Sequence, residues 1–223
     1  MKTGGAVNLS VLATLTLGAL TAGCVNMSTL QTAKALDPGK QRILVGGGYY
    51  ASPSVDADAS EASGSDVSLA LPYMEVGYRR GLMKNFELGA KATIPGTVGL
   101  DGKYQLVNAG KFAVAAGLGT SYLKIESGSD QDKVSTMLVD VIVPAYISYD
   151  VAAPFSIYAS PKYVLRYASS TDMMDTTSGT SHLVGATVGT RLGSRMGLFL
   201  ESSYLKDMTS DFDSFQVNGS IFF

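Results

Sequence analysis

The chain has 223 residues, 16% of them charged, and a formal net charge of −2. The charged share is well below the roughly 25% that is typical of soluble domains, and the absence of a basic excess argues against a nucleic-acid partner. The single cysteine excludes an internal disulfide.

The first residues have the pattern of an export signal. A lysine at position 2 precedes an apolar run over 11–20, and the small residues Ala22 and Gly23 lie directly before Cys24. Because the apolar run is too short for a transmembrane helix, we interpret 1–23 as a secretory signal peptide.

The stretch "LTAGC" resembles the lipobox of bacterial lipoproteins, although Leu20 lies one position further from the cysteine than is usual. The resemblance implies that Cys24 is lipidated. Val25 follows the cysteine where an aspartate would favour the inner membrane, so the resemblance favours the outer membrane of a Gram-negative bacterium. An ordinary export signal followed by an unmodified cysteine is the alternative.

Residues 24–40 form a short polar segment, which we expect on the periplasmic side, with one helical turn before Pro38 and Gly39 end it. After it, apolar and polar residues alternate with the period of two that is typical of strands. The pattern predicts ten strands, over 41–52, 67–81, 84–94, 97–107, 111–126, 135–150, 155–169, 180–193, 196–206 and 213–223. Eight or twelve strands remain possible, because Pro72 interrupts the second strand and "IPGT" at 94–97 is either a turn or a kink.

The connections alternate in length along the chain. Short ones such as "VNAGK" and "LGSRMG" are followed by longer ones such as "ESGSDQDKVS" and "SSTDMMDTTSGTS". Outer-membrane barrels have short periplasmic turns and long outer loops. We therefore predict an all-β fold over 41–223, a closed antiparallel up-and-down transmembrane β-barrel.

The aromatic residues indicate which face of the sheet is outside. In the apolar phase they gather near the strand ends, with aliphatic residues between them, as the two interfaces of a bilayer select. The residues that border the short turns are Tyr78, Phe86, Tyr104, Phe112, Tyr149, Phe155 and Phe223, and those toward the other end are Tyr49, Tyr122, Tyr167, Tyr204 and Phe215. The apolar face is thus predicted to contact lipid. A water-soluble barrel would have the opposite arrangement.

The polar phase holds small residues and sparse charges. Buried charges are costly unless they are paired, so a nearly balanced set is expected to form a network inside the lumen. This set comprises Arg42, Glu75, Arg79, Glu87, Lys91, Asp101, Lys103, Asp140, Lys162, Arg166, Arg191 and Glu201.

The carboxyl-terminal strand resembles the terminal signature of outer-membrane barrels. Phe223 ends the chain, with Phe215, Val217 and Ile221 in the same phase. The resemblance implies that the barrel-assembly machinery reads this strand. Outer-membrane lipid and lipopolysaccharide are the other expected partners, and the protein is expected to be a monomer.

The sequence contains no recognised motif for catalysis or for binding a metal or cofactor. Its acidic residues concentrate in the predicted long loops. Segments such as "ESGSDQD" and "DFD" are expected to bind divalent cations weakly at most. His182, the only histidine, lies near the loop end of its strand, where it has no matching catalytic motif. We expect a non-enzymatic structural or surface-interaction protein. The alternatives are a narrow porin-like channel for small solutes or anions along Lys91, Lys103, Lys162 and Arg166, and an enzyme that uses His182.

Overall fold

The computed structural model describes residues 27–51, 70–94, 96–127, 134–171, 176–209 and 213–223. The predicted signal peptide and Cys24 lie outside these residues. Ten strands are present in the described part of the chain: β1 (Gln41–Ala51), β2 (Ala70–Met83), β3 (Phe86–Ile94), β4 (Thr97–Ala109), β5 (Phe112–Ser127), β6 (Val134–Ala152), β7 (Phe155–Thr171), β8 (Thr176–Gly193), β9 (Gly197–Asp207) and β10 (Asp213–Phe222). Every strand begins and ends within four residues of its predicted bounds.

The strands form one closed antiparallel barrel in which each strand pairs with its neighbours in sequence. The barrel closes where β1 pairs with β10, with Leu44 opposite Phe222 and Tyr50 opposite Gln216. The predicted fold class is confirmed, with a strand count of ten. "IPGT" is a turn between β3 and β4, and Pro72 is accommodated within β2 opposite Tyr49. Because the barrel is closed, no strand edge is left unpaired. Unpaired backbone N–H and C=O groups would be costly in the hydrocarbon of a bilayer.

Glycines allow the closest approach at this closing pair. A Cβ on Gly46 would collide with Ser220 and with the carbonyl of Gly219, and one on Gly48 would collide with the carbonyl of Val217. Gly46 and Gly48 therefore serve the seam between β1 and β10, and Gly47 serves the pairing with β2, where a Cβ would collide with the carbonyl of Tyr73.

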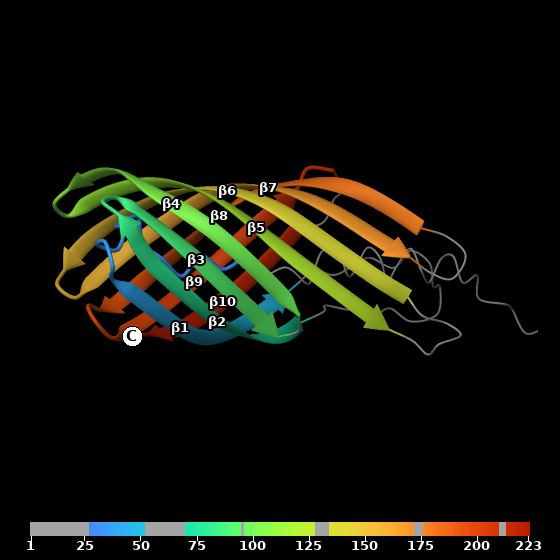
Figure 1. The fold of residues 1–223 in the computed structure, drawn as a ribbon, viewed down its shortest axis with the longest axis horizontal. Coiled ribbons are helices and arrows are strands. Elements are labelled where there is room, and N and C mark those ends of the chain that lie inside the picture. The colour runs from blue at the N-terminus through green and yellow to red at the C-terminus, as the bar shows by residue number, and fades with distance from the viewer. Residues whose placement is uncertain (1–26, 52–69, 95, 128–133, 172–175, 210–212) are drawn as a thin grey trace, which may run out of the picture.

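The two ends of the barrel differ (Figure 1). We call the end with the short connections and the carboxyl terminus the turn end, and the opposite end the loop end. Left-handed backbone at Asn85 and Gly110, with φ of 66° and 65°, makes two of the short turns possible. The strands β6, β7 and β8 have 19, 17 and 18 residues, and Figure 1 shows them projecting furthest at the loop end.

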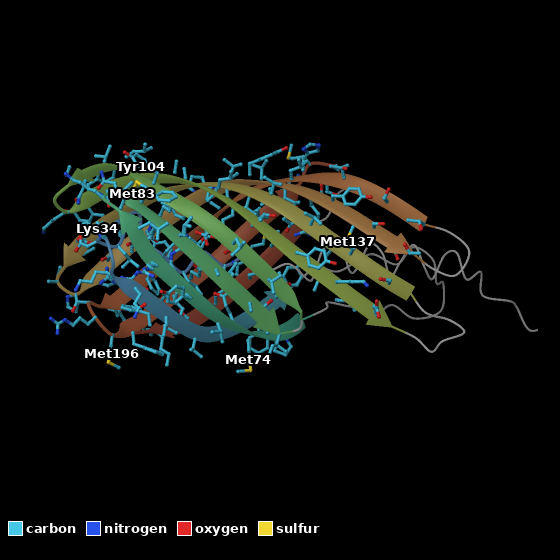
Figure 2. The ribbon with its side chains drawn as sticks, viewed as in Figure 1. Lys34, Met74, Met83, Tyr104, Met137 and Met196 are labelled. Atoms are coloured by element: carbon cyan, nitrogen blue, oxygen red, sulfur yellow. The ribbon has the colours of Figure 1, made fainter. Side chains whose placement is uncertain are left out.

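The outer wall is apolar along most of its height, and polar residues such as Thr180 and Lys124 are exposed toward the loop end. Aliphatic side chains such as Val143 and Val188 are exposed, and so are the predicted aromatic residues Tyr49, Tyr104 and Phe112. Figure 2 shows Met74 and Met196 pointing away from the wall. An exterior of this kind is stable only against hydrocarbon. The predicted inversion is confirmed, and the protein is a transmembrane β-barrel.

The interior is polar where a soluble barrel would be apolar. Serines, threonines, glutamines and most of the predicted charged residues are buried there, and three apolar clusters lie among them. No helix in the described residues is long and apolar enough to cross a membrane.

Candidate functional site: a lumen filled by the amino-terminal segment

Residues 27–36 run through the lumen as an extended segment without helical structure, and we call this segment the plug. At the loop end the backbone N–H of Met27 donates to Oε1 of Gln216 at 3.1 Å. At the turn end the N–H of Leu36 donates to Oε2 of Glu87 at 2.7 Å. Gln216 is near the loop end of β10 and Glu87 is near the turn end of β3. The plug therefore spans much of the height of the barrel before the chain enters β1.

Side chains of the barrel wall accept hydrogen bonds from the N–H groups of the plug. The carboxylate of Glu201 accepts two of them, from Thr29 at 2.7 Å and from Leu30 at 2.8 Å. Farther toward the turn end, Ser148 accepts from Ala33 at 3.2 Å and Gln105 accepts from Ala35 at 2.7 Å. An extended segment has no internal partners for its N–H groups, so these wall residues satisfy them.

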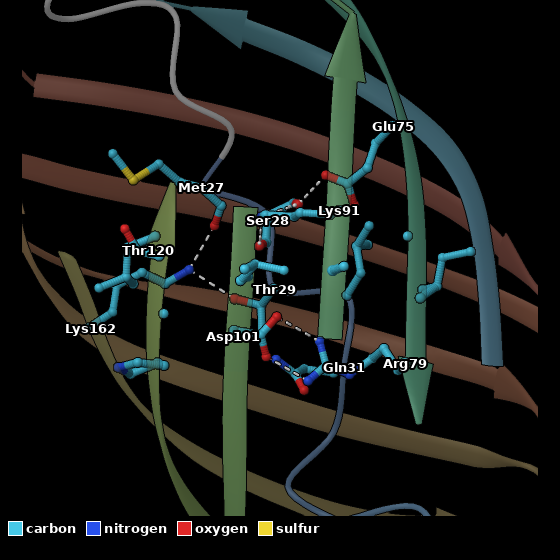
Figure 3. A pocket seen from close by; sticks show the side chains of 18 of the residues that line it. Met27, Ser28, Thr29, Gln31, Glu75, Arg79, Lys91, Asp101, Thr120 and Lys162 are labelled. Atoms are coloured by element: carbon cyan, nitrogen blue, oxygen red, sulfur yellow. Dashed lines mark hydrogen bonds and ion pairs between the residues drawn. The ribbon is translucent and has the colours of Figure 1, made fainter. Parts of the chain in front are cut away.

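Lysines of the wall donate to the carbonyl oxygens of the plug. Lys162 reaches the carbonyl of Met27 at 2.7 Å, Lys91 that of Ser28 at 2.8 Å, and Lys103 that of Thr32 at 2.6 Å. Figure 3 shows Lys162 and Lys91 approaching the plug from opposite sides. The wall thus recognises the main chain of the plug with acceptors for its N–H groups and cations for its carbonyls.

Side chains of the plug add specific contacts. The hydroxyl of Ser28 donates to Glu75 at 2.5 Å, and the amide of Gln31 donates to the hydroxyl of Tyr146 at 2.9 Å. At the turn end, Lys34 forms an ion pair with Asp150 at 2.5 Å. Ala33 is completely buried, so a larger side chain there would have to displace the wall.

The remaining charges of the network pair within the wall. Arg79 bonds both Glu87 at 2.8 Å and Asp101 at 2.6 Å, and Lys103 lies 3.0 Å from Glu87. Nearer the loop end, Arg166 bonds Asp140 at 2.9 Å. The cost of removing these ions from water is offset by their mutual hydrogen bonds.

Apolar side chains pack around the plug at three levels, and at the one nearest the turn end Ala33 packs with Ala113, Ala115 and Tyr146. Met27 joins a cluster on the loop side with Leu123, Leu138, Val164, Ala168, Leu183 and Leu205. Leu30 joins a second cluster with Leu44, Tyr158, Phe199 and Phe222. Beside the plug there remains a cavity of about 60 Å³, lined by Gln31, Lys91 and Asp101 among others. This volume suffices for a few water molecules, one of which would satisfy the Oε1 of Gln31, an atom without a partner among the described residues.

The structure places all twelve residues of the predicted network on the lumen side. Eight are buried, and Arg42, Lys91, Asp101 and Arg191 are partly buried. The expected pairing of these charges among themselves holds only in part, because Lys91, Lys162 and Glu201 bond the plug. The path proposed for anions along Lys91, Lys103 and Lys162 is occupied by the main chain of residues 27–34.

The helical turn expected before Pro38 is absent from the described residues 27–40. Residues 27–36 lie inside the barrel, whereas 37–40 are exposed at its turn end. The physical reason is that the wall supplies partners for the backbone of the plug, which no property of the segment itself reveals. Sequence reasoning also missed Ser148, Gln105 and Gln216, neutral wall residues that became part of the site only through the plug.

Arg42 on β1 and Arg191 on β8 lie toward the turn end of the lumen, next to two packed aromatic rings. Their guanidinium carbons are 4.9 Å and 5.5 Å from the centre of the Phe222 ring, which packs on Phe199. Cation–π contacts of this kind hold cations where carboxylates are lacking.

His182 faces away from the lumen. Its Nδ1 lies 2.5 Å from the hydroxyl of Tyr163 on the neighbouring strand, and both side chains are exposed on the outer wall. Asp172 and Asp175, the acidic residues that precede His182 in the sequence, lie outside the described residues. The structure thus brings His182 together with a tyrosine of the outer wall and with none of the network residues.

The other predicted features divide into two groups. Phe215, Val217, Ile221 and Phe223 all face outward, as their common phase predicts. Most of the acidic loop residues lie outside the described part of the chain, and within that part no three His, Cys, Asp or Glu side chains gather to hold a metal ion.

Comparison with known proteins gives likeness of structure alone. No family model and no curated protein matches the sequence. Among solved structures, the chain is similar to the attachment invasion locus protein Ail of Yersinia pestis, with 10% identity, a TM-score of 0.44, and coverage of 83% of this chain and 99% of Ail. It is also similar to the outer-membrane protease OmpT of Escherichia coli, with 11% identity, a TM-score of 0.45, and coverage of 86% and 98%. It is similar as well to neisserial surface protein A, with 13% identity, a TM-score of 0.44, and coverage of 82% of this chain and 95% of that protein. These three proteins are outer-membrane barrels, and no residue role is carried over from them.

Proposed function

We propose that the protein is an outer-membrane barrel closed by its own plug, with a structural or surface-interaction role that its long loops perform outside the cell. The observation that carries the proposal is the set of hydrogen bonds between Lys162, Lys91, Lys103 and Glu201 and the backbone of the plug. These bonds use the groups that would otherwise line a water path.

The hydrogen bonds and apolar contacts of the plug favour a closed lumen. Hydrogen bonds to charged groups contribute about 1.5–3 kcal/mol each. Withdrawal of the plug would break at least five of them, and it would expose the apolar clusters around Met27 and Leu30. Because several such bonds break together, spontaneous opening is rare. A porin-like channel is therefore the second candidate, favoured only by the slight basic excess of the lumen.

Conductance in planar bilayers tests the proposal. The purified chain should give no steady current, whereas a variant in which residues 27–36 are replaced by a glycine–serine linker of equal length should conduct. Steady anion-selective current through the unaltered chain would overturn the closed-lumen proposal and establish the channel.

We further propose that Cys24 carries the lipid anchor and that His182 has no catalytic role. The lipobox-like sequence supports the first, and mass spectrometry of the mature chain would detect the acyl groups. The outward position of His182 beside Tyr163 supports the second, and His182→Ala should leave every phenotype of the wild type unchanged.

A further inference from the structure

The direction of the plug is fixed by its partners in the wall. Met27 contacts leucines near the loop end, since Leu123 is four residues from the end of β5 and Leu205 is two residues from the end of β9. Lys34 contacts Asp150, two residues from the turn end of β6. The chain therefore travels from the loop end to the turn end between residues 27 and 36.

Among the described residues, the space beside the plug is too small for the chain to pass a second time. Most of the plug between residues 27 and 33 is buried, with Met27, Leu30 and Ala33 at most 3% exposed, and residues 34–36 are partly buried. The cavity beside it measures about 60 Å³, which is enough for a few water molecules and far too little for a second strand. A chain that precedes Met27 thus cannot return to the turn end alongside the plug.

We propose that the polypeptide crosses the membrane through its own barrel, so that the amino-terminal end of the mature chain is displayed on the loop side, at the cell surface. Cys24 precedes Met27 by three residues, a span of about 10 Å at most. An anchor on Cys24 would therefore attach on the surface side, opposite to the periplasmic side expected from the sequence. The barrel then encloses the plug and keeps the amino terminus of the chain on the outer side of the membrane.

The way in which the wall holds the plug is suited to this role. Most of the contacts are to the backbone of the plug, from Glu201, Gln105, Lys103 and Lys162. Contacts of this kind fix the direction of the segment and do not depend on what precedes it. The inference rests on the proposed orientation with long loops outside, which the controls of the test determine separately.

Epitope accessibility on intact cells tests the proposal. A flexible epitope of about twenty residues is inserted between Val25 and Asn26, directly before the plug. In two control chains the same epitope is inserted in the long loop at 52–69 or in the turn between Ala109 and Lys111. Antibody binding is measured before and after permeabilisation of the outer membrane, and resistance of the barrel to protease confirms folding.

We expect the amino-terminal epitope to bind antibody on intact cells as strongly as the loop epitope, while the turn epitope binds only after permeabilisation. Binding at the amino terminus only after permeabilisation, or in neither state, would overturn the proposal even if conductance shows a closed lumen. If the insertion prevents folding, the variant Asn26→Cys, with an unaltered chain to correct for Cys24, is labelled by a membrane-impermeant maleimide. Labelling on intact cells supports the proposal, and labelling solely after permeabilisation contradicts it.

Discussion

The ammonium group of Lys162 donates a hydrogen bond to the carbonyl oxygen of Met27 at 2.7 Å. It also donates to the hydroxyl of Thr29 at 2.8 Å. Lys162 is buried on β7, and its partners belong to a segment more than 130 residues away in sequence. Main-chain and hydroxyl oxygens of the plug thereby satisfy the buried ammonium group.

The variant Lys162→Met should weaken the hold on the plug at the loop end. It keeps much of the side-chain length but removes both hydrogen bonds, so we expect the free energy of unfolding to fall by about 1–3 kcal/mol. Brief current bursts should also appear in planar bilayers. Urea unfolding from lipid vesicles measures the first effect. The control Lys206→Met, at an exposed rim position, should change neither quantity, and an equal effect of the two variants would remove Lys162 from this role.

Replacement of Glu201 should have a larger effect, because four donors converge on its carboxylate. These are the N–H groups of Thr29 and Leu30, the hydroxyl of Tyr158 and the amide of Asn218. Glu201→Gln supplies one acceptor oxygen and directs an amide N–H₂ at the other donors. We expect a loss of about 2–4 kcal/mol in unfolding free energy. Glu126→Gln, at the rim, is the matched control, and a Glu201→Gln chain as stable as that control would refute the prediction.

The buried pair Arg166–Asp140 should behave as a unit. Removing one partner leaves an unpaired charge in the lumen, so Arg166→Met or Asp140→Asn alone should cost about 3–5 kcal/mol. The double variant should cost much less than the sum of the two, because neither charge remains. Unfolding free energies of all four chains form a double-mutant cycle, and additive losses would show that the two residues do not interact.

The cost of placing an arginine on the outer wall should depend on its depth in the bilayer. Val143 is 48% exposed near the middle of β6, where Val143→Arg should destabilise the barrel in vesicles by about 2–4 kcal/mol. Met196→Arg, in a turn at 73% exposure, should have little effect. If the two arginines had equal effects, the outer wall of β6 would not be in contact with hydrocarbon.

The sequence predicts the wall of this barrel well because the wall obeys a simple alternation. Residues such as Tyr104 and Val143 face lipid and residues such as Glu87 and Asp140 face the lumen, so the period of two assigns both faces at once. Short and long connections alternate for the same reason, since each pair of strands returns to one side of the membrane.

The plug could not be predicted because it is recognised mainly through its backbone. Residues such as Thr29 and Ala35 contribute N–H groups that any residue except proline would supply. The available signal was the small excess of bases over acids in the predicted lumen network, seven against five. Two of these bases, Lys91 and Lys162, donate hydrogen bonds to the carbonyl oxygens of Ser28 and Met27.

The position of the plug in the lumen is tested most directly by a disulfide between plug and wall. The N–H of Ala33 lies 3.2 Å from Oγ of Ser148, so the double variant Ala33→Cys/Ser148→Cys should cross-link on mild oxidation of the folded protein. The control Ala33→Cys/Ser203→Cys should not, because Ser203 pairs with Gln216, at the level of Met27. Peptide mass spectrometry that finds the 33–148 disulfide is the predicted result. Two free, alkylated thiols at 33 and 148 in the folded barrel would contradict the account.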